Sequence, residues 1–163
     1  MKKVKVLVSI LCVLLFAMFA LGSGESTSED QGTGSAQKAE TNTNIGNYSV
    51  EIQSCRLAKD FEGKDVVIVK YLYKNVANDN PTAFYIAFDD NVYQNGVGLN
   101  EAYMLADSAQ YSSDNQMKAI KKGASLEVEV AYELNDTTTA VEVEVKELFS
   151  FDNTTITKTF DIA

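Results

Sequence analysis

The stretch Val66-Val-Ile-Val-Lys-Tyr-Leu-Tyr73 decides the fold class. Side chains of a β-strand point alternately to the two faces of a sheet. Here both alternating sets are mostly apolar, so the pattern predicts a strand that is buried on both faces. β-branched and aromatic residues, which favour strands, make up most of the stretch.

Shorter runs of similar composition lie on both sides of this strand, separated by turn signals such as Asn95-Gly96 and Lys122-Gly123. The further predicted strands are residues 48–57, 83–88, 92–94, 126–132, 141–146 and 155–162. About seven short strands predict an all-β domain over residues 47–163, an immunoglobulin-like antiparallel β-sandwich. The segment 99–109 fits either a short helix near 100–107 or an edge strand with a loop.

Glutamates alternate with apolar residues in two consecutive predicted strands. Glu127 and Glu129 lie in the first, and Glu142 and Glu144 lie in the second. Like charges that face one another across a hairpin are destabilising. We therefore expect the two strands to lie in opposite sheets, each with its own acidic face toward solvent. A shifted register within a single sheet is the alternative.

Residues 1–22 have the features of a secretory signal peptide. Lys2, Lys3 and Lys5 precede the apolar run from Val6 to Leu21, and small residues lie just before Ser23. We expect cleavage before Ser23, with an uncleaved membrane anchor as the alternative. Ser23 has no thiol, so the sequence does not support a lipid anchor at this position.

Residues 23–46 are polar and have no hydrophobic periodicity, which predicts a disordered linker. Together, the signal and the linker predict a protein that is secreted or held at the extracellular face of the cell envelope. In this interpretation, only residues 1–22 contact the membrane, and only if they stay attached.

Composition narrows the function classes. The 163 residues contain no His, which excludes imidazole-assisted nucleophiles and the usual Cys/His zinc sites. A formal net charge of −9 argues against sequence-independent binding to nucleic acid. Cys12 lies in the signal, so Cys55 has no partner for a disulfide and is interpreted as a small apolar residue of a strand. We expect no enzymatic activity and no cofactor.

Three pieces of sequence are familiar in combination: Gly63 to Asn75, Val92 to Val97, and Ile120 to Ser125 leading into Ala131-Tyr-Glu-Leu134. Together they resemble a family of uncharacterised secreted and lipoprotein domains of Gram-positive bacteria, a domain of unknown function. More distantly, they resemble telokin-like, immunoglobulin-like envelope proteins. The resemblance implies a fold and a location, and it implies no catalytic residues. Two departures are Lys122, where the turn usually has Pro, and Ser23, near where relatives have a lipidated Cys.

The segment between Pro81 and Gln116 carries the candidate binding residues, because loops on a β scaffold commonly hold binding sites. Aromatic side chains with a polar tip suit a ligand surface. Loop carboxylates suit Ca²⁺, although turn formation explains the same residues. The candidates are Tyr103, Tyr111 and Tyr93 for a ligand, and Asp89, Asp90, Asp107 and Asp114 for calcium.

These features favour a non-catalytic binding module whose partner is an unknown protein or glycan of the cell envelope. A structural or assembly module of an envelope complex is the alternative. A hydrolase that uses paired carboxylates is a third and more distant one.

Overall fold

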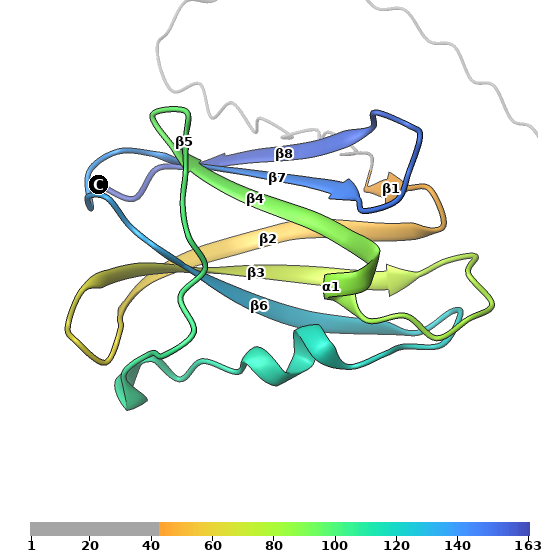
Figure 1. Ribbon diagram of the computed structural model, residues 1–163, viewed down its shortest axis with the longest axis horizontal. Helices are drawn as coiled ribbons and strands as arrows, with labels where there is room; N and C mark the ends of the chain where they lie inside the picture. Colours follow the sequence, from red (N-terminus) through yellow and green to blue (C-terminus); the bar gives the residue numbers. More distant parts are fainter. Residues whose placement is uncertain (1–42) are drawn as a thin grey trace, which may run out of the picture. The chain divides into compact units, whose positions relative to one another are not determined.

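The computed structural model describes residues 43–163, which form two antiparallel sheets in two layers (Figure 1). The first sheet has the order β1-β2-β3-β6, and the second has the order β5-β4-β7-β8. The strands of the first sheet are β1 (Asn44–Ile45), β2 (Tyr48–Lys59), β3 (Asp65–Asn75) and β6 (Ser125–Glu133). Those of the second are β4 (Phe88–Gln94), β5 (Val97–Gly98), β7 (Val141–Glu147) and β8 (Thr155–Phe160). The predicted all-β sandwich is confirmed, and its immunoglobulin-like character stays a prediction.

The predicted signal peptide and residues 23–42 of the predicted linker lie outside the described residues. The remainder of the linker prediction is wrong in one detail. Asn44 and Ile45 form β1 and pair with Ser49 and Tyr48 of β2. Ile45 is the single large apolar residue of the linker and is only 2% exposed, so its burial explains why the sandwich includes residues before Asn47.

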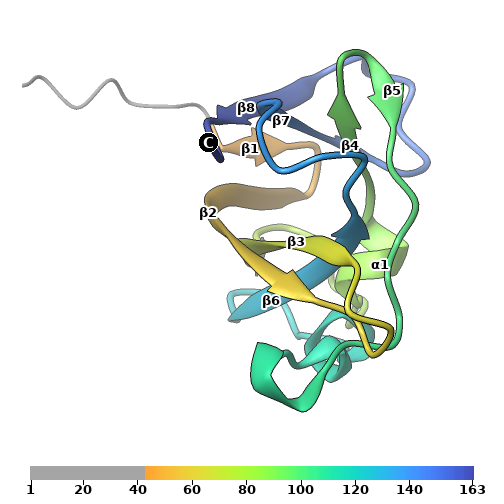
Figure 2. The same ribbon diagram turned by 90° about the vertical axis from the view of Figure 1, so that its left-hand side faces the viewer.

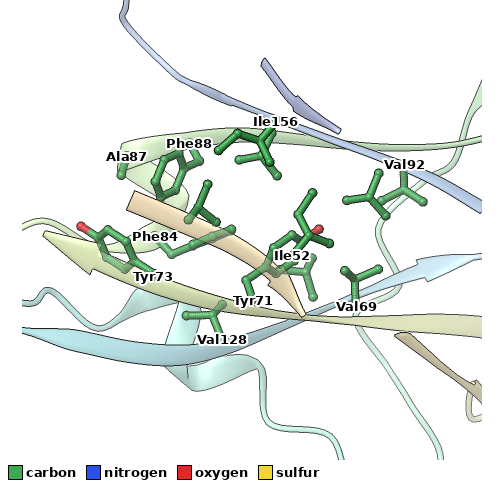
Figure 3. Packing of buried hydrophobic residues seen from close by; sticks show 14 of the residues in the cluster. Ile52, Val69, Tyr71, Tyr73, Phe84, Ala87, Phe88, Val92, Val128 and Ile156 are labelled. Carbon is green, nitrogen blue, oxygen red and sulfur yellow. The ribbon is translucent and has the colours of Figure 1, made fainter. Parts of the chain in front are cut away.

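The core lies between the two sheets. The inward side chains of β3 are Val67, Val69, Tyr71 and Tyr73, and all four are fully buried. They meet apolar side chains of the second sheet such as Val92 and Ile156 (Figure 3). Cys55 packs at the margin of this core as a free, half-buried thiol. Burial raises the pKa of that thiol, which fits its interpretation as an apolar residue.

β3 is buried on its outer face as well. Val66 and Ile68 pack there against Ala102, Leu105 and Tyr111. These three residues belong to the β5–β6 connection, residues 99–124, which leaves β5 and runs past both layers to the far side of the first sheet (Figure 2). The strand buried on both faces is therefore confirmed, and a loop provides its outer cover.

Strands β6 and β7 lie in different sheets, as the alternating glutamates predicted. The connection between these strands is held by Gln94, which is 2% exposed at the end of β4. Its Oε1 accepts a hydrogen bond from the backbone N–H of Asn135 at 2.9 Å. Its Nε2 donates to the carbonyls of Asp136 and Thr139, at 3.0 and 2.9 Å. One buried amide thus fixes the point where the chain crosses between sheets.

We expect Gln94→Ala to lower the free energy of unfolding by about 2 kcal/mol, because buried backbone groups lose their partner. Urea denaturation measures this change. The half-buried Gln116 provides a matched control, and Gln116→Ala should change stability by less than about 0.5 kcal/mol. Equal effects of the two substitutions would contradict the role of Gln94.

One predicted strand is wrong, and for residues 99–109 the structure favours the alternative of an edge strand with a loop. Residues 83–88 do not form a strand, because α1 (Phe84–Ala87) is a single helical turn that leads into β4. No α-helix forms near 100–107, because the backbone there pairs with the free edge of β6. The Glu133 N–H donates a hydrogen bond to the Asn100 carbonyl, and the Ala102 N–H donates one to the Ala131 carbonyl, both at 2.8 Å. A backbone that bonds to a strand edge lacks the partners for helical hydrogen bonds. The short 3₁₀ helices η1 (Asp107–Ala109) and η2 (Ser113–Met117) come later.

Candidate functional site

The β5–β6 connection is fixed to the first sheet by polar contacts as well as by its apolar cover. Arg56, on the outer face of β2, donates hydrogen bonds to the carbonyls of Ala109 and Gln110, both at 3.2 Å. Its guanidinium also forms an ion pair with Glu129 of β6 at 2.6 Å. Asn115 Nδ2 donates to the Glu127 carbonyl at 2.9 Å. The connection is therefore an ordered surface on a β scaffold, the usual setting for a binding site.

A first hollow, which we call the apolar hollow, lies between this connection and the β2–β3 turn. Its volume is about 580 Å³, and Tyr103, Tyr111, Phe61 and Met104 are among its lining residues. Tyr103 is 78% exposed, and Phe61 and Met104 are each 62% exposed. Tyr111 is half-buried, and burial raises the pKa of its hydroxyl to about 12. The structure thus brings together two of the three predicted ligand-binding tyrosines.

A second hollow, which we call the acidic hollow, shares Tyr103 with the first. Its volume is about 390 Å³. Three carboxylates line it, and so do aromatic and other apolar side chains. The carboxylates are Asp89, Asp90 and Glu101, and the apolar residues include Tyr85, Phe88, Tyr103, Met117 and Leu148. The Glu101 carboxylate raises the pKa of the Tyr103 hydroxyl through its charge and through a hydrogen bond.

Asp90 is the carboxylate on which burial acts most. Desolvation raises its pKa from 3.8 to about 6, and the nearby Glu101 charge adds to this effect. The Tyr132 hydroxyl of β6 donates a hydrogen bond to Asp90 and partly offsets the rise. The Tyr71 hydroxyl of β3 lies beside the same pair. A titratable group in a hollow, with its pKa moved into the physiological range, is a recognised mark of a functional site.

The remaining predicted residues lie apart from these contacts. Tyr93 packs beside Gly98 on the second sheet and lines neither hollow. Of the predicted calcium ligands, Asp89 and Asp90 line the acidic hollow, Asp107 lines the apolar hollow, and Asp114 lies in η2. Among residues 43–163, no group of three or more His, Cys, Asp or Glu side chains could hold a metal ion. The four aspartates therefore do not form the cluster that a calcium site requires.

Sequence reasoning missed Glu101, Tyr85 and Tyr132 as site residues. Tyr85 projects from a helical turn that was expected to be a strand, and it is 45% exposed. Tyr132 belongs to a core strand, and only its hydroxyl reaches the site through Asp90. The ambiguous assignment of residues 99–109 concealed Glu101. The available signal was the sequence Asn100-Glu-Ala-Tyr103, which places an acid next to the predicted ligand tyrosine.

A family model described as "Domain of unknown function (DUF5067)" matches residues 23–147 of the sequence. The chain belongs to this family. Membership confirms the expected relation to a domain of unknown function, and it assigns no activity to DUF5067 members. A comparison with curated proteins finds no match.

Two solved structures are similar to this DUF5067 chain. One is described as a putative lipoprotein from Staphylococcus aureus, with 17% sequence identity and a TM-score of 0.53. The match covers 71% of this chain and 84% of that one. The other is a protein from Enterococcus faecalis, also 17% identical, with a TM-score of 0.55 and coverage of 74% and 88%. At this identity the likeness shows a shared fold.

Within the part of the chain that the structure describes, no helix has the length and apolar character needed to cross a membrane.

Proposed function

We propose that this domain is a non-catalytic binding module at the extracellular face of the bacterial cell envelope, and that it captures a protein segment through the two hollows. One observation carries the proposal. The exposed Tyr103 lies at the junction of both hollows, on a connection that is fixed to the sandwich. Exposed aromatic side chains next to well-formed hollows are typical anchors of a binding surface.

The chemistry of the apolar hollow supports a protein partner over a glycan. Phe61, Met104 and Leu105 line it beside Tyr103, and a thioether side chain adapts readily to apolar side chains of a partner. Asp107, Gln110 and Ser113 also line this hollow, and their polar groups suit the backbone N–H and C=O groups of a peptide. The envelope location is supported by the signal-like N-terminus and by the similar fold of a protein described as a putative lipoprotein.

We expect Tyr103→Ala to reduce partner capture at least about tenfold, because a central aromatic anchor commonly contributes more than 1.4 kcal/mol to binding. The measurement is chemical crosslinking of the full chain on intact cells, followed by mass-spectrometric identification of the crosslinked peptides. Circular dichroism of the variant verifies its fold.

Phe151→Ala is the matched control, since Phe151 is a fully exposed aromatic residue that lines neither hollow. Undiminished capture by a folded Tyr103→Ala protein would contradict the proposed site. Crosslinks to a glycan in place of a peptide would contradict the protein partner, and turnover in a broad hydrolase screen would contradict the non-catalytic role.

An assembly module is the second candidate, and the β7–β8 loop favours it. Phe149 and Phe151 are 85% and 106% exposed there, on a loop that leads away from β7. Two exposed phenylalanines on one loop suit a permanent neighbour in an envelope complex. In this case, the crosslinking experiment gives the opposite pattern: Phe151→Ala loses the neighbour and Tyr103→Ala retains it.

A further inference from the structure

The described side chains that line the acidic hollow include three carboxylates and no basic group. Asp89, Asp90 and Glu101 line it, and none of the described lining residues is Lys or Arg. Lys146 Nζ lies 3.6 Å from Asp89, and both side chains are nearly half exposed, so this carboxylate has a cation at the surface. Among residues 43–163, no Lys or Arg forms an ion pair with Asp90 or Glu101. Two of the three carboxylates thus have no protein cation.

Polar groups behind the hollow are also incompletely satisfied. Tyr132 donates its hydroxyl proton to Asp90. The Tyr71 hydroxyl is completely buried, is directed at Asp90 and Tyr132, and meets no hydrogen-bond partner of acceptable geometry. Buried polar groups without partners are uncommon, because each one costs free energy. A cation beside Asp90 would favour the ionised carboxylate, which accepts the Tyr132 hydrogen bond, and would offset part of the cost of burying that charge.

The other side chains that line the acidic hollow indicate which kind of cation fits there. Tyr85, Phe88 and Tyr103 provide aromatic rings, and Met117 and Leu148 add apolar surface. Rings and apolar side chains suit an alkyl stem with a cationic head, whereas Ca²⁺ needs six to eight oxygen ligands. Carboxylates accept hydrogen bonds, so a primary ammonium group that donates three fits better than a quaternary one that donates none. A volume of about 390 Å³ accommodates one long side chain.

We infer that the acidic hollow binds a primary alkylammonium group, the side chain of a lysine in the captured segment, with Asp90 and Glu101 as its counter-ions. The inference rests on the proposed binding function, because the adjoining apolar hollow would hold the neighbouring residues of the same segment. Tyr103 lies between the two hollows and contacts both parts of the ligand.

Binding of this kind depends on the ionisation of Asp90. The titratable groups that act on Asp90 are Tyr71 of β3, Tyr132 of β6, Glu101 and Tyr111 of the connection, and Asp89 of β4, which pairs with Lys146 of β7. With its pKa at about 6, Asp90 is ionised at pH 7.5 and largely protonated at pH 5. The affinity for the ammonium group should therefore fall about tenfold between pH 7.5 and pH 5.

The test is an NMR titration of the full chain with Nα-acetyl-lysine N-methylamide as the probe. We expect saturable shifts at Asp90, Glu101 and Tyr103, and none with the Nε-acetylated probe, which lacks the charge. Asp90→Asn should weaken binding at least tenfold. Asp114→Asn, which removes a carboxylate from η2 outside both hollows, should leave binding unchanged.

Several results would overturn the inference: no saturable shifts with the lysine probe, equal binding of the acetylated probe, or full binding by Asp90→Asn. Binding of 1,4-diaminobutane without binding of the lysine probe would overturn the assignment to a protein side chain.

Failure of the ammonium site is distinguishable from failure of the proposed function. If the probe does not bind but Tyr103→Ala still loses the crosslinked peptide, only the ammonium site is wrong. If the probe binds and Tyr103→Ala retains its neighbour, the proposed capture surface is wrong.

Discussion

Replacing Asp90 with asparagine should stabilise the domain at neutral pH by up to about 3 kcal/mol. Burial raises the pKa of this carboxyl from 3.8 to about 6, so the folded protein binds the proton more tightly than the unfolded chain. The stabilisation from protonation is complete below pH 3.8 and is lost as the pH rises through about 6. Above that pH the native protein carries the full cost of a buried charge, and the neutral asparagine avoids it at every pH.

Guanidinium unfolding at two pH values measures the effect. The gain from Asp90→Asn should be largest at pH 7.5 and shrink to about 0.5 kcal/mol at pH 4. The asparagine carbonyl still accepts the hydrogen bond from Tyr132, so little packing changes. Asp89→Asn is the control on the same strand; its side chain is 44% exposed and its stability should change by less than about 0.5 kcal/mol. A destabilised Asp90→Asn protein at pH 7.5 would show that the carboxylate charge itself holds the fold together.

A stability cost at Asp90 is informative about function. Groups that lower stability recur at functional sites, where the demands of activity and stability conflict. The same substitution is expected to strengthen the fold and to weaken ammonium binding, and a general packing defect would weaken both. Measured together, the two effects separate a ligand group from a structural one.

Local patterns in the sequence predicted most of the sandwich. The strand from Val66 to Tyr73 and the separation of β6 from β7 follow from alternation and from like-charge repulsion, which are local properties of the chain. The site does not follow in the same way. Glu101 meets Asp90 only because the β5–β6 connection bonds to the edge of β6, and alternation carries no information about that route.

The sequence pieces that resemble the family have an architectural role. Asn75 ends the first piece, and its Nδ2 donates to the carbonyl of Ile120, which begins the third, at 3.2 Å. Gly123 N–H in turn donates to the Asn75 carbonyl at 2.7 Å. Gln94 of the second piece fixes the β6–β7 crossing. The three pieces therefore contain residues that hold the sandwich together. The residues that line the two hollows lie outside these pieces, so the resemblance gave no information about the site.

The segment Ala83-Phe-Tyr-Ile-Ala-Phe88 shows where periodicity misled. In a strand, Phe84, Ile86 and Phe88 would share one face. In the structure Phe84, Ala87 and Phe88 are buried, a spacing of three and four residues, while Tyr85 and Ile86 are nearly half exposed. The buried positions have helical spacing, but the helix is a single turn. Over so few residues, the sequence pattern cannot be distinguished from the alternation of a strand. The turn directs Tyr85 to the acidic hollow and Phe84 to the core.

Phe84→Ala should therefore lower the free energy of unfolding by about 3–5 kcal/mol, the range for removing a fully buried aromatic side chain. The Phe84 ring centroid lies 5.1 Å from that of Tyr71 and 5.2 Å from that of Phe88, so the substitution empties the centre of an aromatic cluster. Ile86→Ala is the matched control, since its side chain is 44% exposed and should cost less than about 1 kcal/mol. Urea denaturation of both variants distinguishes the two backbone conformations. In a strand, Ile86 would be buried beside Phe84, and Ile86→Ala would lower the free energy of unfolding by about 2–5 kcal/mol. The helical turn requires a small loss of stability for Ile86→Ala and a large one for Phe84→Ala.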